Sequence, residues 1–108
     1  MNLGELIAAL EAVPNQNGLV PWGFGDPDSY RGYYEDVAFE PANNVTIAAM
    51  LASARSALGT TFEGYKGGDY LMTEHTDCWI STYGEASQEM ITDTLVKYMI
   101  LSVTRGDG

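Results

Sequence analysis

Three stretches of the chain carry apolar residues at helical spacing. Residues 2–13 begin with Asn2 and Glu5 in the pattern of a capping box and end at Pro14. Residues 46–58 begin with Thr46, a suitable N-cap, and are followed by Gly59, a suitable C′ residue. Residues 87–103 repeat the periodicity, and residues 104–108 follow as a flexible tail. The predicted buried stripes are Leu3, Leu6, Ile7 and Leu10; Ile47, Met50, Leu51, Ala54 and Leu58; and Met90, Ile91, Leu95, Tyr98, Met99 and Ser102.

The stretch between the first two helices predicts two strands. Residues 33–40 alternate, and the side that holds Val37 and Phe39 is the expected core face, before Pro41 ends the strand. Residues 19–24 are interrupted by Pro21 and Gly23, which favours an edge strand or a bulge. Residues 25–29 contain Gly, Pro, Asp and Ser, which favours a loop.

The segment after the second helix predicts further short strands. Residues 60–65 and 78–83 are rich in β-branched and aromatic residues, residues 66–69 form a turn, and residues 70–72 continue the strand or return from it. Each half of the chain thus resembles a helix followed by a hairpin. We predict a single α+β domain covering residues 1–108, in the order α-β-β-α-β-β-α, with an antiparallel sheet of about four strands and helices packed on one face.

Charge narrows the classes of partner. The chain has 15 acidic and 5 basic residues in 108, a formal charge of −10, and the acids are scattered over both halves. Such a field repels nucleic-acid phosphate and anionic membranes, because both are bound mainly through Lys and Arg. It favours encounter with a positively charged protein surface, although acidity also serves solubility alone.

Cysteine content and hydropathy indicate the compartment. Cys78 is the only cysteine, so no internal disulfide forms and a reducing compartment is favoured. The sequence contains neither a signal-peptide pattern nor an apolar run long enough to span a membrane. We expect a cytoplasmic protein.

Residues with catalytic or metal-binding chemistry are few. A Cys-His pair would have to use Cys78 and His75, the only histidine, and the scattered carboxylates do not follow the spacing of a calcium loop. The glycines in residues 64–68 match neither the P-loop nor the Rossmann pattern. We therefore expect no enzyme, no catalytic residue, no metal and no cofactor.

The most distinctive local feature is a cluster of tyrosines and acids. Tyrosine supplies rigid contact area with a hydrogen-bonding end, and carboxylates accept bidentate hydrogen bonds from Arg. Tyrosines that pack the sheet while acids face water would give the same pattern. The predicted binding residues are Tyr33, Tyr34, Glu35, Asp36, Tyr65 and Asp69.

Four blocks of the sequence resemble a family of small proteins encoded by bacteriophages and prophages. These blocks are residues 29–41 (SYRGYYEDVAFEP), 50–59 (MLASARSALG), 62–70 (FEGYKGGDY) and 76–80 (TDCWI). The resemblance implies a phage origin, with no established activity and no functional residues to transfer. Small acidic phage proteins that lack an evident active site are often inhibitors of host defence, including anti-CRISPR proteins, and this step is an analogy.

The leading hypothesis is a phage-encoded binding protein, a monomer or homodimer in the bacterial cytoplasm. It would inhibit a nucleic-acid-handling defence complex by imitating nucleic acid on the basic surface of a host protein or ribonucleoprotein, without binding nucleic acid or membrane itself. One alternative is a small-molecule-binding protein that uses Lys66, His75 and the tyrosines. Another is an accessory structural or regulatory phage protein that assembles through its C-terminal helix.

Overall fold

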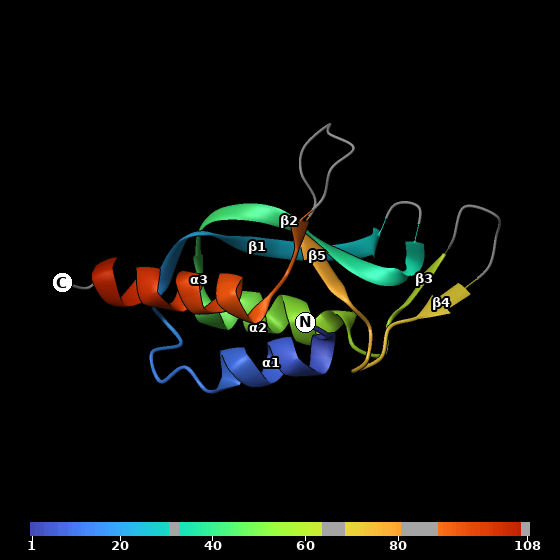
Figure 1. Cartoon of the computed structure of the whole chain (residues 1–108), viewed down its shortest axis with the longest axis horizontal. Helices are drawn as coiled ribbons and strands as arrows, with labels where there is room; N and C mark the ends of the chain where they lie inside the picture. The colour runs from blue at the N-terminus through green and yellow to red at the C-terminus, as the bar shows by residue number, and fades with distance from the viewer. Residues whose placement is uncertain (31–32, 64–68, 81–88, 107–108) are drawn as a thin grey trace.

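A computed structural model describes the backbone of residues 1–30, 33–63, 69–80 and 89–106, and the side chains of residues 1–27, 36–61, 71–80 and 90–103. The elements along the chain are shown in Figure 1. They are α1 (Leu3–Glu11), β1 (Leu19–Tyr30), β2 (Tyr33–Thr46), α2 (Ile47–Ala57), β3 (Thr61–Glu63), β4 (Asp69–Leu71), β5 (Cys78–Ile80), β6 (Glu89–Met90) and α3 (Asp93–Gly106).

The first two helices begin where their capping residues predict. In α1, the Asn2 carboxamide oxygen accepts the Glu5 amide at 2.9 Å, and the Glu5 carboxylate accepts the Asn2 amide at 3.0 Å. In α2, the Thr46 hydroxyl accepts the Ala49 amide at 3.0 Å. Gly59 follows α2 with a φ of +80°, a conformation that glycine adopts at little cost. Both predicted helices are confirmed together with their caps, but the predicted buried stripes are wrong at Leu58, which follows α2 and is 45% exposed, and at Tyr98 of α3, which is 63% exposed.

The third helix begins later and ends later than predicted. Met90 is paired with Trp79 in the antiparallel contact between β5 and β6, so residues 89–90 are strand and not helix. The Thr92 hydroxyl accepts the Leu95 amide at 3.2 Å and caps the start of α3. The helix then continues through residues 104–106, which the sequence assigns to a tail, and residues 107–108 lie outside the described residues.

β1 and β2 form an antiparallel hairpin that is longer than the sequence indicates. The expected loop at residues 25–29 is part of β1, and the expected strand end at Pro41 lies inside β2, so both predictions are wrong. β1 is an edge strand with a bulge between Phe24 and Pro27, as its Pro and Gly content favours. β5 pairs with β2 only from Val37 to Phe39. Pro41 lies beyond this pairing, so the amide donor that proline lacks is not needed for a hydrogen bond to β5.

The main sheet has three principal strands in the order β1-β2-β5, with the two-residue β6 added beside β5. β2 and β5 run parallel, while β3 and β4 form a hairpin in a separate two-stranded sheet. The helix-then-hairpin pattern of each half is therefore confirmed, but the prediction of one antiparallel sheet of about four strands is wrong. The chain passes through α2 and the β3–β4 hairpin between β2 and β5, and a connection of this length permits parallel pairing.

The hydrophobic core lies between the main sheet and the helices. Figure 1 shows all three described helices on the same side of the β1–β2 hairpin; α2 and α3 contact β1, and α1 contacts α2 and α3. Val37 and Phe39 are fully buried, as predicted, and the Phe39 ring lies 4.6 Å from that of Phe24 between centroids. The described residues thus form the expected α+β arrangement. None of the described helices has the length and apolar content needed to cross a bilayer.

Gly23 of β1 faces α2 at a point where a side chain has no room. A Cβ atom there would lie 2.6 Å from the Met50 sulfur and 2.7 Å from a Val45 methyl carbon, and Val45 is stiff because it is β-branched. We expect Gly23→Ala to lower the free energy of unfolding by about 1–3 kcal/mol, measured by urea denaturation.

Gly25→Ala is the matched control on the same strand. Its nearest neighbour would be the Ala42 Cβ at 3.7 Å, an ordinary van der Waals contact, and its φ is not positive. We expect no loss, or a gain of up to about 1 kcal/mol from the stiffer unfolded chain. Equal destabilisation by the two substitutions would show that Gly23 does not mark a close contact.

Candidate functional site

Five of the six predicted binding residues lie on strands of two hairpins, β1–β2 and β3–β4. β2, which contains Tyr33, Tyr34, Glu35 and Asp36, is in contact with β4, which contains Asp69, and Figure 1 shows the two hairpins side by side. Of the six side chains, only that of Asp36 is described. Tyr65 lies outside the described residues, and so do the side chains of the other four. The strands of the two sequence clusters are therefore neighbours, and the convergence of their side chains stays a prediction.

Asp36 is joined to an aromatic residue on the outer surface of the main sheet. Its Oδ2 atom accepts a hydrogen bond from the indole Nε1 of Trp79 at 3.2 Å, and both side chains are partly buried. The interaction fixes a negative charge beside a partly exposed aromatic ring.

The parallel register brings a second carboxylate next to Asp36. Val37 and Cys78 are partners in the β2–β5 pair and are both fully buried. Since successive side chains along a strand point to opposite faces, the preceding residues Asp36 and Asp77 lie beside each other on the outer face. The Val37 amide donates to the Asp77 carbonyl at 3.0 Å, which extends the ladder to this position.

The segment that precedes β5 is held by the start of α1. The Leu3 amide donates to the Thr76 carbonyl, and the Gly4 amide to the Glu74 carbonyl, each at 2.8 Å. A Cβ on Gly4 would lie 3.1 Å from the Glu74 Cβ, so glycine permits this close approach. The Thr76 hydroxyl accepts the Thr73 amide at 2.8 Å. Asp77 thus follows a segment whose backbone is fixed on both sides.

Further acids lie on the same hairpin. Glu40 is exposed on β2, four residues after Asp36 and on the same face by alternation, and Asp26 is exposed within the bulge of β1. Neither these two residues nor Asp77 forms an ion pair with any base in the described residues. We define the outer acidic face as Asp36, Glu40, Asp77 and Trp79.

The described basic side chains are occupied on other elements. Arg55 of α2 pairs with Glu11 of α1 at 2.9 Å, and Lys97 pairs with Asp93 within α3 at 3.0 Å. His75 lies 3.3 Å from Glu74 in the segment before β5. The described Lys and Arg side chains are therefore paired with acids on the helices. The N-terminal amino group is the positive charge that acts on Cys78, the residue that follows Asp77 of the outer acidic face.

Cys78 and His75 are not arranged as a nucleophile and its base. Cys78 is fully buried and its sulfur approaches the Thr76 carbonyl oxygen at 3.8 Å, whereas the His75 side chain is 81% exposed. Burial raises the pKa of the Cys78 thiol from 9.0 to about 12; the positive N-terminal amino group opposes this shift, and the negative charges of Asp77 and Asp36 add to it. The described part of the chain also brings together no group of three His, Cys, Asp or Glu side chains that could hold a metal ion.

The raised pKa predicts an unreactive thiol in the native protein. At about pH 8, we expect Cys78 to react with Ellman's reagent far more slowly than in urea, because the native thiol is both buried and protonated. The protonated thiol stabilises the folded state relative to the unfolded state. This contribution is fully present below the unfolded pKa of 9.0 and is lost as the pH rises toward 12. If Cys78 of the native protein reacted quickly, at a rate that urea did not change, the thiol would not be buried and protonated as described.

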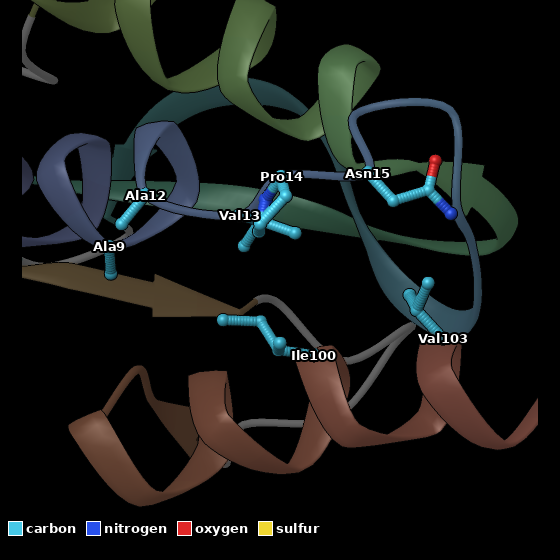
Figure 2. A pocket seen from close by; sticks show the side chains of 7 residues that line it. All are labelled: Ala9, Ala12, Val13, Pro14, Asn15, Ile100 and Val103. Atoms are coloured by element: carbon cyan, nitrogen blue, oxygen red, sulfur yellow. The ribbon is translucent and has the colours of Figure 1, made fainter.

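Two hollows lie away from the outer acidic face. The first, shown in Figure 2, is an apolar groove of about 470 Å³ between the C-terminal parts of α1 and α3. It is lined by Ala9, Ala12, Val13, Pro14, Asn15, Ile100 and Val103. The second is a shallow depression of about 450 Å³ that includes His75 and Leu71. Of the residues expected to hold a small molecule, only His75 lines a described hollow, and Lys66 lies outside the described residues.

Comparison of the chain with protein-family models, curated proteins and solved structures finds no match. The resemblance to phage proteins therefore stays an expectation. The site must be interpreted from its own geometry.

The sequence does not single out two members of the outer acidic face, Asp77 and Trp79. Alternation within residues 77–80 places both opposite Cys78 and Ile80, which gives a usable indication that they share a surface. Their position beside Asp36 depends on the parallel pairing of β5 with β2. Local patterns do not reveal this pairing.

Proposed function

We propose that this chain is a phage-encoded, non-enzymatic binding protein that inhibits a nucleic-acid-handling defence complex of the bacterial host, as anti-CRISPR proteins do. It acts in the cytoplasm and contacts a basic protein surface rather than nucleic acid. The observation that carries the proposal is the outer acidic face, where Asp36 accepts a hydrogen bond from Trp79 and the register of β2 with β5 places Asp77 on the same face.

The chemistry of this face suits arginine and lysine side chains that normally hold phosphate. Carboxylates accept charge-assisted hydrogen bonds from a guanidinium group, and a Trp ring attracts a cation to its face. The hydrogen bond from Trp79 to Asp36 orders both groups before binding, which reduces the entropy lost on association. The formal charge of −10 adds long-range attraction and accelerates encounter with a basic groove.

The tyrosines extend this proposal to the neighbouring hairpin ends. Tyr33, Tyr34, Glu35, Tyr65 and Asp69 would enlarge the face if their side chains turn toward it. The contact between β2 and β4 supports this extension. The proposed partner surface would then span both hairpins.

A pair of charge-matched variants tests the mechanism. Asp36→Asn with Asp77→Asn changes the formal charge from −10 to −8, and the carboxamide oxygen introduced at position 36 can still accept the Trp79 hydrogen bond. We expect this double variant to bind a fluorescent deca-arginine peptide about tenfold more weakly in an anisotropy titration, since two exposed charge contacts are worth about 1–2 kcal/mol together.

Glu5→Gln with Glu11→Gln is the control. It also gives −8, lies outside the outer acidic face, and keeps a side chain that can complete the capping box, although it removes the exposed ion pair between Glu11 and Arg55. We expect its affinity to stay within about threefold of the wild type, because only the overall field changes. Equal weakening by the two double variants would show that bulk charge, and not the outer acidic face, governs binding.

Capture from a bacterial lysate tests the biological partner. We expect the immobilised wild-type chain to retain a nucleic-acid-binding complex that double-stranded DNA and high salt both release, because the protein and the DNA compete for one basic surface. The face variant should retain less of that complex than the α1 control. A partner held equally in high salt and in the presence of DNA would contradict nucleic-acid imitation.

A further inference from the structure

The turn at residues 15–18 holds the end of α1. The Gln16 side chain donates through Nε2 to the carbonyl oxygens of Leu10 and Val13, at 3.0 and 2.7 Å. Carbonyl groups at the C-terminal end of a helix have no partner within the helix, so they need a donor from outside it. Gln16 supplies this donor and ties the turn to α1.

The same turn holds the start of α2. The Gln16 carbonyl accepts the Ala48 amide at 2.8 Å, and the Gly18 carbonyl accepts the Ile47 amide at 3.1 Å. These are the first two amides of the helix, which have no acceptor within it. Two carbonyl groups of the turn therefore have to match two consecutive amides of α2, and the length of the main chain between Gln16 and Gly18 sets this match.

Packing requires glycine at position 18. Gly18 is buried, and a Cβ atom on it would overlap the Cγ1 atom of Val103. Figure 2 shows Val103 of α3 pointing toward the loop that follows Asn15. Asn17 is the only asparagine of the sequence that precedes a glycine, and its side chain is exposed. Asparagine is chemically labile, most of all before glycine, because no side chain then shields the amide nitrogen that follows it.

Deamidation of such a pair is an intramolecular reaction that needs only water. The Gly18 amide nitrogen loses its proton and attacks the Asn17 Cγ atom, while the side-chain nitrogen takes up a proton and leaves as ammonia. The product is a succinimide ring. Water then opens the ring at either carbonyl and gives aspartate or isoaspartate, and in isoaspartate the main chain runs through Cγ and is one carbon longer.

The folded turn opposes the first step of this reaction. The Gly18 amide donates to the Asn15 carbonyl at 3.2 Å, and the attack would remove this hydrogen bond together with the proton. The Gly18 carbonyl is held by α2, so the turn also resists the backbone rotation that the attack requires. Water reaches the exposed Asn17 side chain, so the protection comes from the backbone and not from exclusion of solvent.

We propose that Asn17 is a deamidation site that the folded turn protects, and that isoaspartate at this position uncouples α1 from α2. The extra carbon lies between the carbonyl groups of Gln16 and Gly18, so the two no longer match consecutive amides of α2. A chain that has opened at this turn and reacted returns to a less stable fold. The inference does not depend on the proposed function, because the turn shares no residue with the outer acidic face.

Incubation at one mildly alkaline pH, in guanidinium chloride and in buffer with the same concentration of sodium chloride, tests the protection. We expect Asn17 of the unfolded chain to deamidate at least about a hundredfold faster than Asn17 of the native chain, because only opened turns react. Peptide mass spectrometry locates the product, and Asn17→Ala should abolish the rapid reaction. Equal rates in the two solutions, or a rapid reaction that persists in Asn17→Ala, would overturn the proposal.

Gln16→Ala tests the role of the turn, because it removes the side-chain hydrogen bonds to α1 and keeps the backbone carbonyl that α2 uses. We expect the native deamidation rate to rise at least about tenfold, with no change in guanidinium chloride. Ser56→Ala is the control, since it removes a side-chain hydrogen bond to the Ser53 carbonyl within α2. It should change the native rate by less than about threefold. Equal effects of the two substitutions would show that the turn does not govern the reaction.

The isoaspartyl chain, purified from the unfolded sample after reaction, tests the effect on the fold. Asn17→Asp is its matched control, because the two chains are isomers with the same charge and differ only in the course of the main chain. We expect the unfolding equilibrium constant of the isoaspartyl chain to be at least about tenfold larger than that of Asn17→Asp, measured by guanidinium denaturation. Identical denaturation curves would contradict the uncoupling of the two helices.

Discussion

The parallel pairing of β5 with β2 is the constraint on which the candidate site depends. Three residue pairs, from Val37 with Cys78 to Phe39 with Ile80, decide which side chains of the two strands share a face. A shift of one residue would turn Cys78 outward and bury Asp77 and Trp79. Burying the Asp77 carboxylate costs far more than packing the Trp79 ring would return, so the hydrophobic core and the polar surface select the same register.

The described charged residues are also distributed unevenly over the elements. The described bases lie on α2, on α3 and before β5, each beside an acid, whereas Asp26 and Glu40 of the main sheet pair with none of them. Among the described side chains, the ion pairs of Lys and Arg thus lie on the helices, and the acids of the main sheet take no part in them.

Local sequence patterns predict the helices and their caps well because those features depend on residues three or four positions apart. Asn2 with Glu5, and Thr46 followed by an apolar stripe, are sufficient to place α1 and α2. The same patterns fail at Pro27 and Pro41, where pairing between β1 and β2 overrides the local preference for a loop. They also fail at residues 89–90, where Met90 meets Trp79 across a contact that no local pattern encodes.

The residues of the outer acidic face likewise divide into one that local patterns predict and others that depend on long-range pairing. Asp36 is predictable because alternation in residues 33–40 places it opposite Val37, on the side that faces away from the core. Asp77 and Trp79 are not, since their position beside Asp36 results from a long-range parallel contact. Tyr33, Tyr34 and Glu35 of β2 and Asp69 of β4 lie on strands that are in contact, but the two hairpins belong to separate sheets and not to the single sheet that the sequence predicts.

The close contact between the first turn of α1 and residues 74–76 links the helical layer to the sheet surface. The amides of Leu3 and Gly4, which would otherwise make the positive end of α1 available to an anion, are taken up by carbonyl groups of the chain itself. Force applied to the strand that follows would reach α1 through these two hydrogen bonds rather than dissipate in a loose loop. The helix therefore supports the sheet surface mechanically, and the missing side chain of Gly4 is what permits this close approach.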